Sequence, residues 1–361
     1  MDKVYMKRAL ELAELGRGKV APNPMVGAVI VKAGKIIGEG YHKKYGDNHA
    51  EVNAFENATE DVSGATLYVT LEPCAHYGKT PPCAKRIVKE GIKKVVIGVL
   101  DPNPLVAGKG VNILKDAGIE VVVGVLEEEC RKINEVFMKY IKTSRPFVLM
   151  KYAMSLDGKI STATGKSKWI SCEKSRRDVH KLRNNLSAIM VGINTVIKDN
   201  PMLNCRIEGG NDPIRIIVDS NLRIPLDSKI VNTSNNISTI VATTHKADKD
   251  KIKLLEERNV EVIVAKEKDG RVDITSLIDK LGEKKIDSIL LEGGSEINFS
   301  CLQEGIVDKV RIYIAPKILG GNNAKGAVGG RGVSEIIDSF NIENIDISTI
   351  GSDILVEGYV K

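Results

Sequence analysis

Three residues of metal-ligand type, all within the first 83 positions, constrain the fold of this chain more than any other feature. His49, Cys74 and Cys83 offer one imidazole and two thiols, which are ligands that Zn²⁺ prefers. Three protein ligands leave the fourth tetrahedral position open to water, as in catalytic rather than structural zinc sites. The chain must therefore fold so that three segments distant in sequence meet at one point.

Glu51 lies two residues after the histidine and suits the transfer of protons to and from a water molecule. A His-x-Glu sequence followed by Pro-Cys is typical of zinc-dependent nucleobase deaminases, in which water attacks a ring carbon and an amine leaves. Cys83 is expected to open a helix, where the helix dipole favours thiolate over thiol. Glu51 is thus the predicted proton carrier of a hydrolytic site.

One alternative for the metal is a structural zinc ion with a fourth ligand, which His42 or His76 would supply. The general deaminase signature also has two residues between its cysteines, whereas residues 75–82 separate them here. This insertion must loop out beside the metal. It carries His76 and Lys79, both able to contact a substrate.

Length and composition indicate a two-domain intracellular protein. A chain of 361 residues is long for one domain. The N-terminus has no apolar signal region and no run of residues is apolar enough to span a membrane, so we expect a cytoplasmic protein without a membrane partner. The net charge of +6 is small and no basic tract is present, which favours anionic small ligands over nucleic acid. Six cysteines without a signal peptide do not indicate a disulfide framework.

The first half of the chain alternates helical and strand patterns, which is typical of an α/β layer domain. Helices are expected at 2–15, from near 49, at 83–90, 111–116 and 126–142, and strands at 26–31, 36–40, 66–70, 94–99 and 120–124.

The composition changes at residues 143–146, and a second alternation follows. Strands are expected at 147–153, 188–191, 214–218, 238–242, 260–264, 286–291, 308–315 and 353–360, and helices at 173–184, 249–258, 274–282 and 295–303. The glycine-rich residues 320–332 are expected to form a loop.

Residues 70–83 (TLEPCAHYGKTPPC) and 21–27 (APNPMVG) resemble the deaminase domain of the bifunctional riboflavin-biosynthesis deaminase–reductases. In that family the long spacing between the two cysteines is the rule. The resemblance extends over the whole chain. It implies a cytidine-deaminase-like three-layer α/β/α domain at 1–144 and a dihydrofolate-reductase-like α/β domain at 145–361.

Carried over by position, the family's zinc ligands fall on His49, Cys74 and Cys83, and its proton shuttle on Glu51. Lys79 is a mobile cation suited to a phosphate. Asp101 and Asn103 follow a strand, although turn residues there are also common without a ligand. The resemblance places the deaminase substrate at Asn23, His42, His76, Lys79, Asp101 and Asn103.

In the second half, two arginines reaching one pocket would clamp a phosphate by bidentate hydrogen bonds. The resemblance places Arg183 and Arg206 on the ribose phosphate, with Ser167, Leu203 and Glu292 also at the substrate. No residue there stands out as the acid, and Lys151, Asp199 or Glu292 is a candidate to assist the reduction.

The cofactor residues of the second half rest largely on the resemblance, which also implies NADPH rather than NADH. Glycines before a helix let backbone N–H groups approach a pyrophosphate, but the Rossmann fingerprint is absent. The cofactor contacts implied are Ala153, Trp169, Thr195, Asp199, Ser220, Gly294, Ser295, Glu296, Ile297, Asn298, Phe299 and Ser300.

The resemblance implies two successive reactions on a phosphorylated pyrimidine: zinc-dependent hydrolytic deamination, then reduction of the ribosyl group to a ribityl chain by NADPH. We also expect a homo-oligomer. Two other classes remain open. One is a deaminase of cytidine, deoxycytidylate or a tRNA adenine with an accessory domain, which would not bind NADPH. The other is a non-enzymatic zinc module, which would unfold on metal removal.

Overall fold

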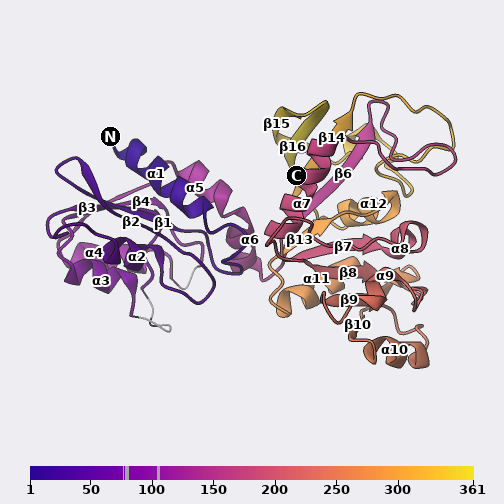
Figure 1. The fold of residues 1–361 in the computed structure, drawn as a ribbon, viewed down its shortest axis with the longest axis horizontal. Helices are drawn as coiled ribbons and strands as arrows, with labels where there is room; N and C mark the ends of the chain where they lie inside the picture. The colour runs from indigo at the N-terminus through magenta and orange to yellow at the C-terminus, as the bar shows by residue number, and fades with distance from the viewer. Residues whose placement is uncertain (76, 78–80, 104–105) are drawn as a thin grey trace. The chain divides into compact units, whose positions relative to one another are not determined.

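The computed structural model describes residues 1–75, 77, 81–103 and 106–361. The chain divides into two compact units, Met1–Ser144 and Arg145–Lys361. Each unit has one large mixed sheet with helices on both faces, so both are α/β (Figure 1). Within the described ranges no helix has the length and apolar character needed to cross a membrane.

The sheet of the first unit has five strands in the order β2-β1-β3-β4-β5. β1 is antiparallel to β2 and β3, and β3, β4 and β5 are parallel. The strands are β1 (Gly27–Lys32), β2 (Lys35–Tyr41), β3 (Thr66–Leu71), β4 (Lys94–Val99) and β5 (Glu120–Val123). The carboxyl ends of β3 and β4 therefore lie side by side at one edge of the sheet.

Helices cover both faces of this sheet and give the expected three-layer α/β/α arrangement (Figure 1). Ala28 and Ile30 of β1 belong to the core cluster on one face, whereas Val29 and Val31 belong to the cluster on the other, as strand alternation requires. A side chain at Gly27 would place its Cβ 1.9 Å from the carbonyl oxygen of Ala9, so only glycine allows this close approach of helix and strand. The helices are α1 (Asp2–Glu14), α2 (Ala50–Glu56), α3 (Cys83–Lys89), α4 (Lys109–Asp116), α5 (Glu127–Ile133) and α6 (Glu135–Thr143).

The single helix expected over 126–142 is wrong, because Asn134 separates α5 from α6. The Asn134 side chain is buried, accepts a hydrogen bond from the Met25 N–H and donates one to the Met25 carbonyl, both at 2.8 Å. A long-range contact of this kind leaves no periodic signal in the local sequence.

The second unit has a nine-stranded sheet in the order β10-β9-β8-β7-β13-β6-β14-β16-β15. The strands from β10 to β14 in this order are parallel, and β16 and β15 are antiparallel additions at one edge. Their bounds are β6 (Phe147–Ser155), β7 (Ala188–Gly192), β8 (Ile214–Val218), β9 (Thr239–Thr243), β10 (Val260–Val264), β13 (Ser288–Leu291), β14 (Lys309–Ala315), β15 (Ile342–Ile350) and β16 (Asp353–Val360).

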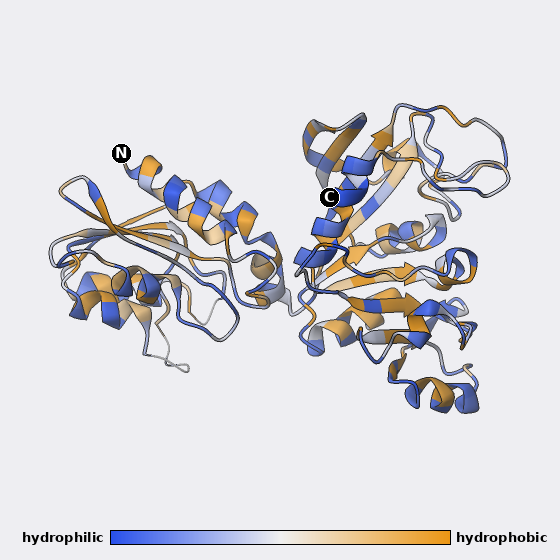
Figure 2. Ribbon diagram, in the orientation of Figure 1, coloured by the Kyte–Doolittle hydropathy of each residue, from blue (hydrophilic) through white to orange (hydrophobic). Residues whose placement is uncertain are grey.

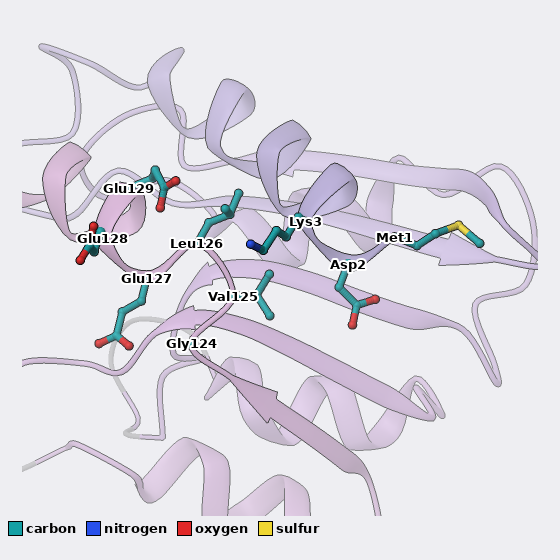
Figure 3. A pocket seen from close by; sticks show the side chains of 9 residues that line it. All are labelled: Met1, Asp2, Lys3, Gly124, Val125, Leu126, Glu127, Glu128 and Glu129. Carbon is teal, nitrogen blue, oxygen red and sulfur yellow. The ribbon is translucent and has the colours of Figure 1, made fainter.

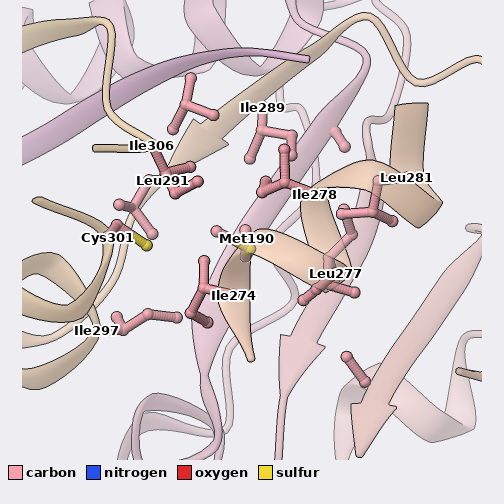
Figure 4. Close-up of a cluster of buried hydrophobic side chains, with 14 of the residues drawn as sticks. Met190, Ile274, Leu277, Ile278, Leu281, Ile289, Leu291, Ile297, Cys301 and Ile306 are labelled. Carbon is pink, nitrogen blue, oxygen red and sulfur yellow. The ribbon is translucent and has the colours of Figure 1, made fainter. Parts of the chain in front are cut away.

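The apolar strands of the second unit lie between helices whose outward positions are hydrophilic (Figure 2). On one face, Leu277 and Leu281 of α11 and Ile297 of α12 pack against Met190 and Leu291 of the sheet (Figure 4). The helices are α7 (Glu173–Asn185), α8 (Ile193–Asp199), α9 (Lys229–Asn232), α10 (Lys249–Glu256), α11 (Ile274–Glu283) and α12 (Ser295–Gln303), with a 3₁₀ turn at Ile336–Asp338.

Several elements were not expected from the sequence. They are the short helices α8 and α9, the nine-residue edge strand β15, and the small hairpin of β11 (Glu267–Lys268) and β12 (Arg271–Val272). Residues 320–332 contain no helix or strand, which agrees with the predicted loop.

The strand order of the second unit creates a natural ligand site. β13 lies between β6 and β7, which are consecutive in the chain, and the later strands extend outward from both sides. In parallel sheets, ligands bind outside the carboxyl ends of the strands at such a switch in order. The segments that follow β6, β7, β8 and β13 therefore form the expected site.

Candidate functional site

The three predicted metal ligands meet in the first unit. His49 is the N-cap residue of α2, Cys74 follows β3, and Cys83 is the first residue of α3. The His49 Nδ1 atom lies 3.6 Å from the Cys74 sulfur and 3.3 Å from the Cys83 sulfur. Ligands bonded to one tetrahedral zinc ion are separated by about 3.5 Å, given normal Zn–N and Zn–S bond lengths. The three ligand atoms are therefore already spaced to hold zinc.

The charges around these residues also favour a cation. A hydrogen bond with Cys83 lowers the pKa of Cys74, which favours the thiolate form of Cys74. A hydrogen bond with that thiolate raises the pKa of His49 to about 9. The negative charge of Cys74 that favours a proton on His49 also favours a metal cation among the same three residues.

Glu51 lies in the first turn of α2, and only 4% of its surface is exposed. Burial, together with the negative charge of Cys74, raises the pKa of Glu51 to about 7. A buried carboxyl group with a pKa near neutrality can both accept and release a proton, as a general acid–base group must.

His42 is not placed to be a fourth ligand, because both of its ring nitrogens have other partners. Its Nδ1 lies 3.1 Å from the Asn48 carbonyl, so this nitrogen carries the proton and donates. Burial lowers the pKa of His42, so the ring is neutral and its Nε2 accepts from the Asn23 amide at 3.3 Å. The described residues with ligand atoms in reach of one another are His49, Cys74 and Cys83. His76 and Lys79 lie outside the described residues.

Asp101 and Asn103 follow β4, beside the segment that carries Cys74. The Asp101 carboxylate accepts a hydrogen bond from the Asn103 N–H at 2.8 Å, and the Asp101 N–H donates to Glu72 at 3.1 Å. Glu72 was not among the predicted site residues. Its position in the sequence, between a buried strand and the Pro-Cys pair, could have indicated that Glu72 belongs to the site.

A surface pocket in the first unit contains none of the predicted site residues (Figure 3). It is lined by the first residues of the chain and by the start of α5. Three consecutive glutamates, Glu127 to Glu129, stand on its wall. We assign no function to it.

In the second unit, Arg183, Glu292 and Lys151 form a half-buried charged group. Glu292 follows β13, Arg183 is on α7 and Lys151 is on β6. Arg183 Nε and Nη2 donate to the two Glu292 oxygens at 2.7 and 3.2 Å, and Lys151 Nζ lies 3.5 Å from Glu292. Burial alone would raise the pKa of Glu292, but the two cations outweigh it and hold the pKa at about 2. Glu292 is therefore ionised at neutral pH, and Arg183 already has a carboxylate partner.

The irregular segment 200–206 is held by side chains from around it. Arg183 Nη1 donates to the Asn204 carbonyl at 3.0 Å, and Arg215 Nη1 donates to the Met202 carbonyl at 3.3 Å. Arg215 is fully buried on β8 and was not predicted as a site residue. Leu203 has a positive φ of 53° and is buried. The segment carries Leu203 and Arg206, both predicted at the substrate.

Arg206 is exposed, and its charge, like that of Arg183, affects the pKa of His180. Burial first, and then the charges of Arg183 and Arg206, lower the pKa of His180. Both arginines are thus near His180, and Arg183 is engaged with Glu292.

Most predicted cofactor residues follow the carboxyl ends of parallel strands. Ala153 is on β6, Thr195 and Asp199 are on α8 directly after β7, and Ser220 follows β8. Gly294 is the N-cap of α12, and a Cβ on Gly294 would lie 3.9 Å from the Thr195 hydroxyl. α12 contains the other predicted residues of this group, which are Ser295, Glu296, Ile297, Asn298, Phe299 and Ser300.

Trp169 is exposed in the 156–172 connection, and Arg176 of α7 stacks over its ring at 4.6 Å. Ser167 lies in the same connection.

Comparison with known proteins identifies both units. A family model for the RibD C-terminal domain matches residues 146–356, and a model for the cytidine and deoxycytidylate deaminase zinc-binding region matches residues 1–99. The chain belongs to the RibD family. It is 52% identical to riboflavin biosynthesis protein RibD of Actinobacillus pleuropneumoniae, over 99% of this chain and 94% of that protein. It is 38% identical to RibD of Escherichia coli K12, over 98% of each chain.

Solved RibD structures have the same fold over the full length. RibD of Acinetobacter baumannii matches with a TM-score of 0.89 and 39% identity, covering 100% of this chain and 99% of that one. A Thermotoga maritima protein matches with a TM-score of 0.88 and 42% identity over the same shares. That protein is described as a diaminohydroxyphosphoribosylaminopyrimidine deaminase and 5-amino-6-(5-phosphoribosylamino)uracil reductase.

Membership of the RibD family decides between the classes that the sequence left open. The chain is a bifunctional enzyme of riboflavin biosynthesis, a hydrolase (deaminase) and an oxidoreductase (reductase). A non-enzymatic zinc module and a deaminase with an unrelated accessory domain are both inconsistent with this result. Zinc fits the first unit and NADPH the second.

Proposed function

We propose that the first unit deaminates 2,5-diamino-6-ribosylamino-4(3H)-pyrimidinone 5′-phosphate and that the second reduces the ribosyl group of the product. The observation that carries the proposal is the buried Glu51 carboxyl group beside three spaced zinc ligands. The substrate is the one expected for the family, and the Thermotoga relative is described by the same two reactions.

In the deamination, His49, Cys74 and Cys83 hold zinc, which supplies Lewis-acid activation of water when bound. Glu51 takes a proton from the attacking water and returns it to the departing amine, so that water and the amine are exchanged for a carbonyl oxygen and ammonia. The neutral His42 ring holds the amide NH₂ of Asn23, which leaves the Asn23 carbonyl oxygen to accept a hydrogen bond from the pyrimidine. Asp101 and Asn103 are assigned to the same substrate, with His76 and Lys79.

In the reduction, NADPH supplies a hydride when bound at the carboxyl ends of β6, β7, β8 and β13. Hydride addition at C1′ of the ribosyl group breaks the bond between C1′ and the ring oxygen, and a proton added to that oxygen completes the ribityl chain. We assign Lys151, together with Glu292 and Asp199, to assist the transfer of this proton to the ring oxygen. Arg206, Ser167 and Leu203 are assigned to the substrate. Arg183 orients Glu292 and the 200–206 segment, and two of its five N–H groups remain for a phosphate.

A substrate panel tests the first step. We expect zinc-loaded enzyme to release ammonia from the phosphoribosylated diaminopyrimidinone and not from cytidine or deoxycytidylate at equal concentration. Release from deoxycytidylate at a comparable rate would contradict the substrate assignment.

We also propose that the enzyme is a homo-oligomer in the cytoplasm. The outer strand of the second sheet, β15, exposes Ile345 and Ile347 by 56% and 67%. An apolar edge strand in water is a site for pairing with a second copy of the chain. The six free cysteines suit a reducing compartment.

The substitution Ile347→Lys is expected to shift the enzyme from oligomer to monomer, measured by sedimentation equilibrium, because a charge on an edge strand opposes pairing. Lys253→Ala, an exposed change on α10 of the same unit and away from β15, serves as the control. A wild-type enzyme that sediments as a monomer would contradict the proposal.

A further inference from the structure

Glu72 is a buried carboxylate that no step of the deamination uses. It follows β3 directly and precedes the Pro73-Cys74 pair, and 4% of its surface is exposed. One of its oxygens accepts hydrogen bonds from the N–H groups of Asp101 and Gly108, at 3.1 and 3.0 Å. Its other oxygen accepts from the Val111 N–H at 3.2 Å. Three backbone donors, all from the chain after β4, thus converge on one side chain.

Two of these donors belong to the start of helix α4, which has no cap of its own. The N-cap residue is Gly108, with a φ of 78°, and glycine offers no side-chain acceptor. Glu72 accepts from the N-cap N–H and from that of Val111, the third residue of the helix. Glu72 therefore caps the N-terminus of α4, although it lies far from this helix in the sequence. Its negative charge is also favourable at a helix N-terminus.

The same helix touches the segment that carries the zinc ligand. A Cβ at Gly110 would lie 2.1 Å from the Pro73 carbonyl oxygen and 3.2 Å from the Glu72 side chain. The first turn of α4 thus packs directly on the Pro73 backbone and the Glu72 side chain. Cys74 is the next residue, so α4 lies against the segment that carries this zinc ligand.

We propose that Glu72 is a positioning residue for the deamination, which fixes the segment containing Asp101 and Asn103 at a set distance from the zinc ligand Cys74. The proposal rests on the function proposed above, in which Asp101 and Asn103 contact the substrate. Glu72 acts through these residues and does not itself touch the pyrimidine or the metal.

The chemistry requires a carboxylate at this position. A carboxylate has two oxygens that only accept, which matches three N–H donors. Among the described residues, no lysine or arginine forms an ion pair with Glu72, so backbone N–H groups are the partners that replace its hydration. Glutamine has the same shape, but its NH₂ group would replace one of the two accepting oxygens. The backbone N–H groups bound to that oxygen would then be buried without an acceptor.

The test is Glu72→Gln in the full-length, zinc-loaded enzyme, measured by the substrate dependence of ammonia release. We expect KM to rise by roughly tenfold, the loss of about one charge-assisted hydrogen bond, with kcat changed much less. Zinc content, measured by metal analysis, and the reductase rate are expected to stay at the wild-type level. Glu120→Gln, an exposed residue at the start of β5, is the matched control and should change neither constant.

A second variant, Asn103→Ala, separates this proposal from the assignment of the substrate segment. A rise of KM in both variants supports the positioning role. A rise of KM in Asn103→Ala alone would overturn the role of Glu72 and leave the proposed function intact. An unchanged KM in Asn103→Ala would overturn the assignment of the segment and the role of Glu72 with it. Loss of zinc at unchanged KM in Glu72→Gln would show a purely structural residue and also overturn the proposal.

Discussion

Replacing Glu51 with glutamine is expected to reduce deamination by at least about 100-fold, the usual contribution of a general acid–base group. Glutamine keeps the size and polarity of the side chain but cannot take up or release a proton at neutral pH. Glu51 is not itself one of the three zinc ligands, so zinc content should not change, and the reductase rate should remain at the wild-type level. Ammonia release, metal analysis and NADPH oxidation with the deaminated intermediate measure the three quantities.

Glu60→Gln is a suitable control for this experiment, because it makes the same chemical change at an exposed position just beyond α2. Loss of zinc or unfolding in Glu51→Gln, with a normal control, would mean that the carboxyl group is structural. A deamination rate near that of the wild type would remove Glu51 from the mechanism altogether.

The second large effect is expected for Arg183→Ala in the reductase unit. Among the described residues, the change leaves the half-buried Glu292 carboxylate with Lys151 at 3.5 Å as its remaining cation, and it removes the donor to the Asn204 carbonyl. Loss of charge-assisted hydrogen bonds of this kind costs binding and orientation free energy. We therefore expect kcat/KM for reduction to fall roughly 10- to 100-fold. Deamination should be unaffected, because each unit has its own core.

Arg177→Ala on the same helix is the matched control, since the Arg177 side chain is 76% exposed and pairs only across one helical turn with Glu173. Surface ion pairs of this type contribute little to the free energy of folding. An equal loss of both activities in Arg183→Ala would contradict the assignment of two independent sites.

The zinc site could be predicted from the sequence because its chemistry restricts the residue types. Only a few side chains bind zinc, so His49, Cys74 and Cys83 are recognisable before their distances are known. Glu51 was recognisable for the same reason, since a carboxyl group two residues from a metal ligand has an evident use. The structure adds the distances that make these residues one site.

The roles of Glu72 and Arg183 could not be predicted, because their partners lie far away in the sequence. Glu292 is 109 positions from Arg183, and Val111 is 39 positions from Glu72. Neither pair follows a helical or strand period. The pairing of Arg183 with Glu292 also changes its expected role from a phosphate ligand alone to a residue that orients Glu292.

Secondary structure was predictable where burial imposes a clear pattern and not elsewhere. The buried strands β4 and β9 were evident from their apolar runs. β15 was not, because seven of its nine residues are exposed and the strand is held by β16 on one side. The short helix α8 follows β7 without an intervening turn, so no stop signal separates the two elements.

The central claim is that one chain carries out zinc-dependent deamination and then NADPH-dependent reduction. The most direct test follows ammonia release and NADPH oxidation separately, on the phosphoribosylated diaminopyrimidinone, with and without a zinc chelator. We predict NADPH oxidation only after zinc-dependent ammonia release, and reduction of the isolated intermediate that continues in the chelator. Ammonia release without any NADPH oxidation, or reduction of the intermediate that stops with the chelator, would contradict the account.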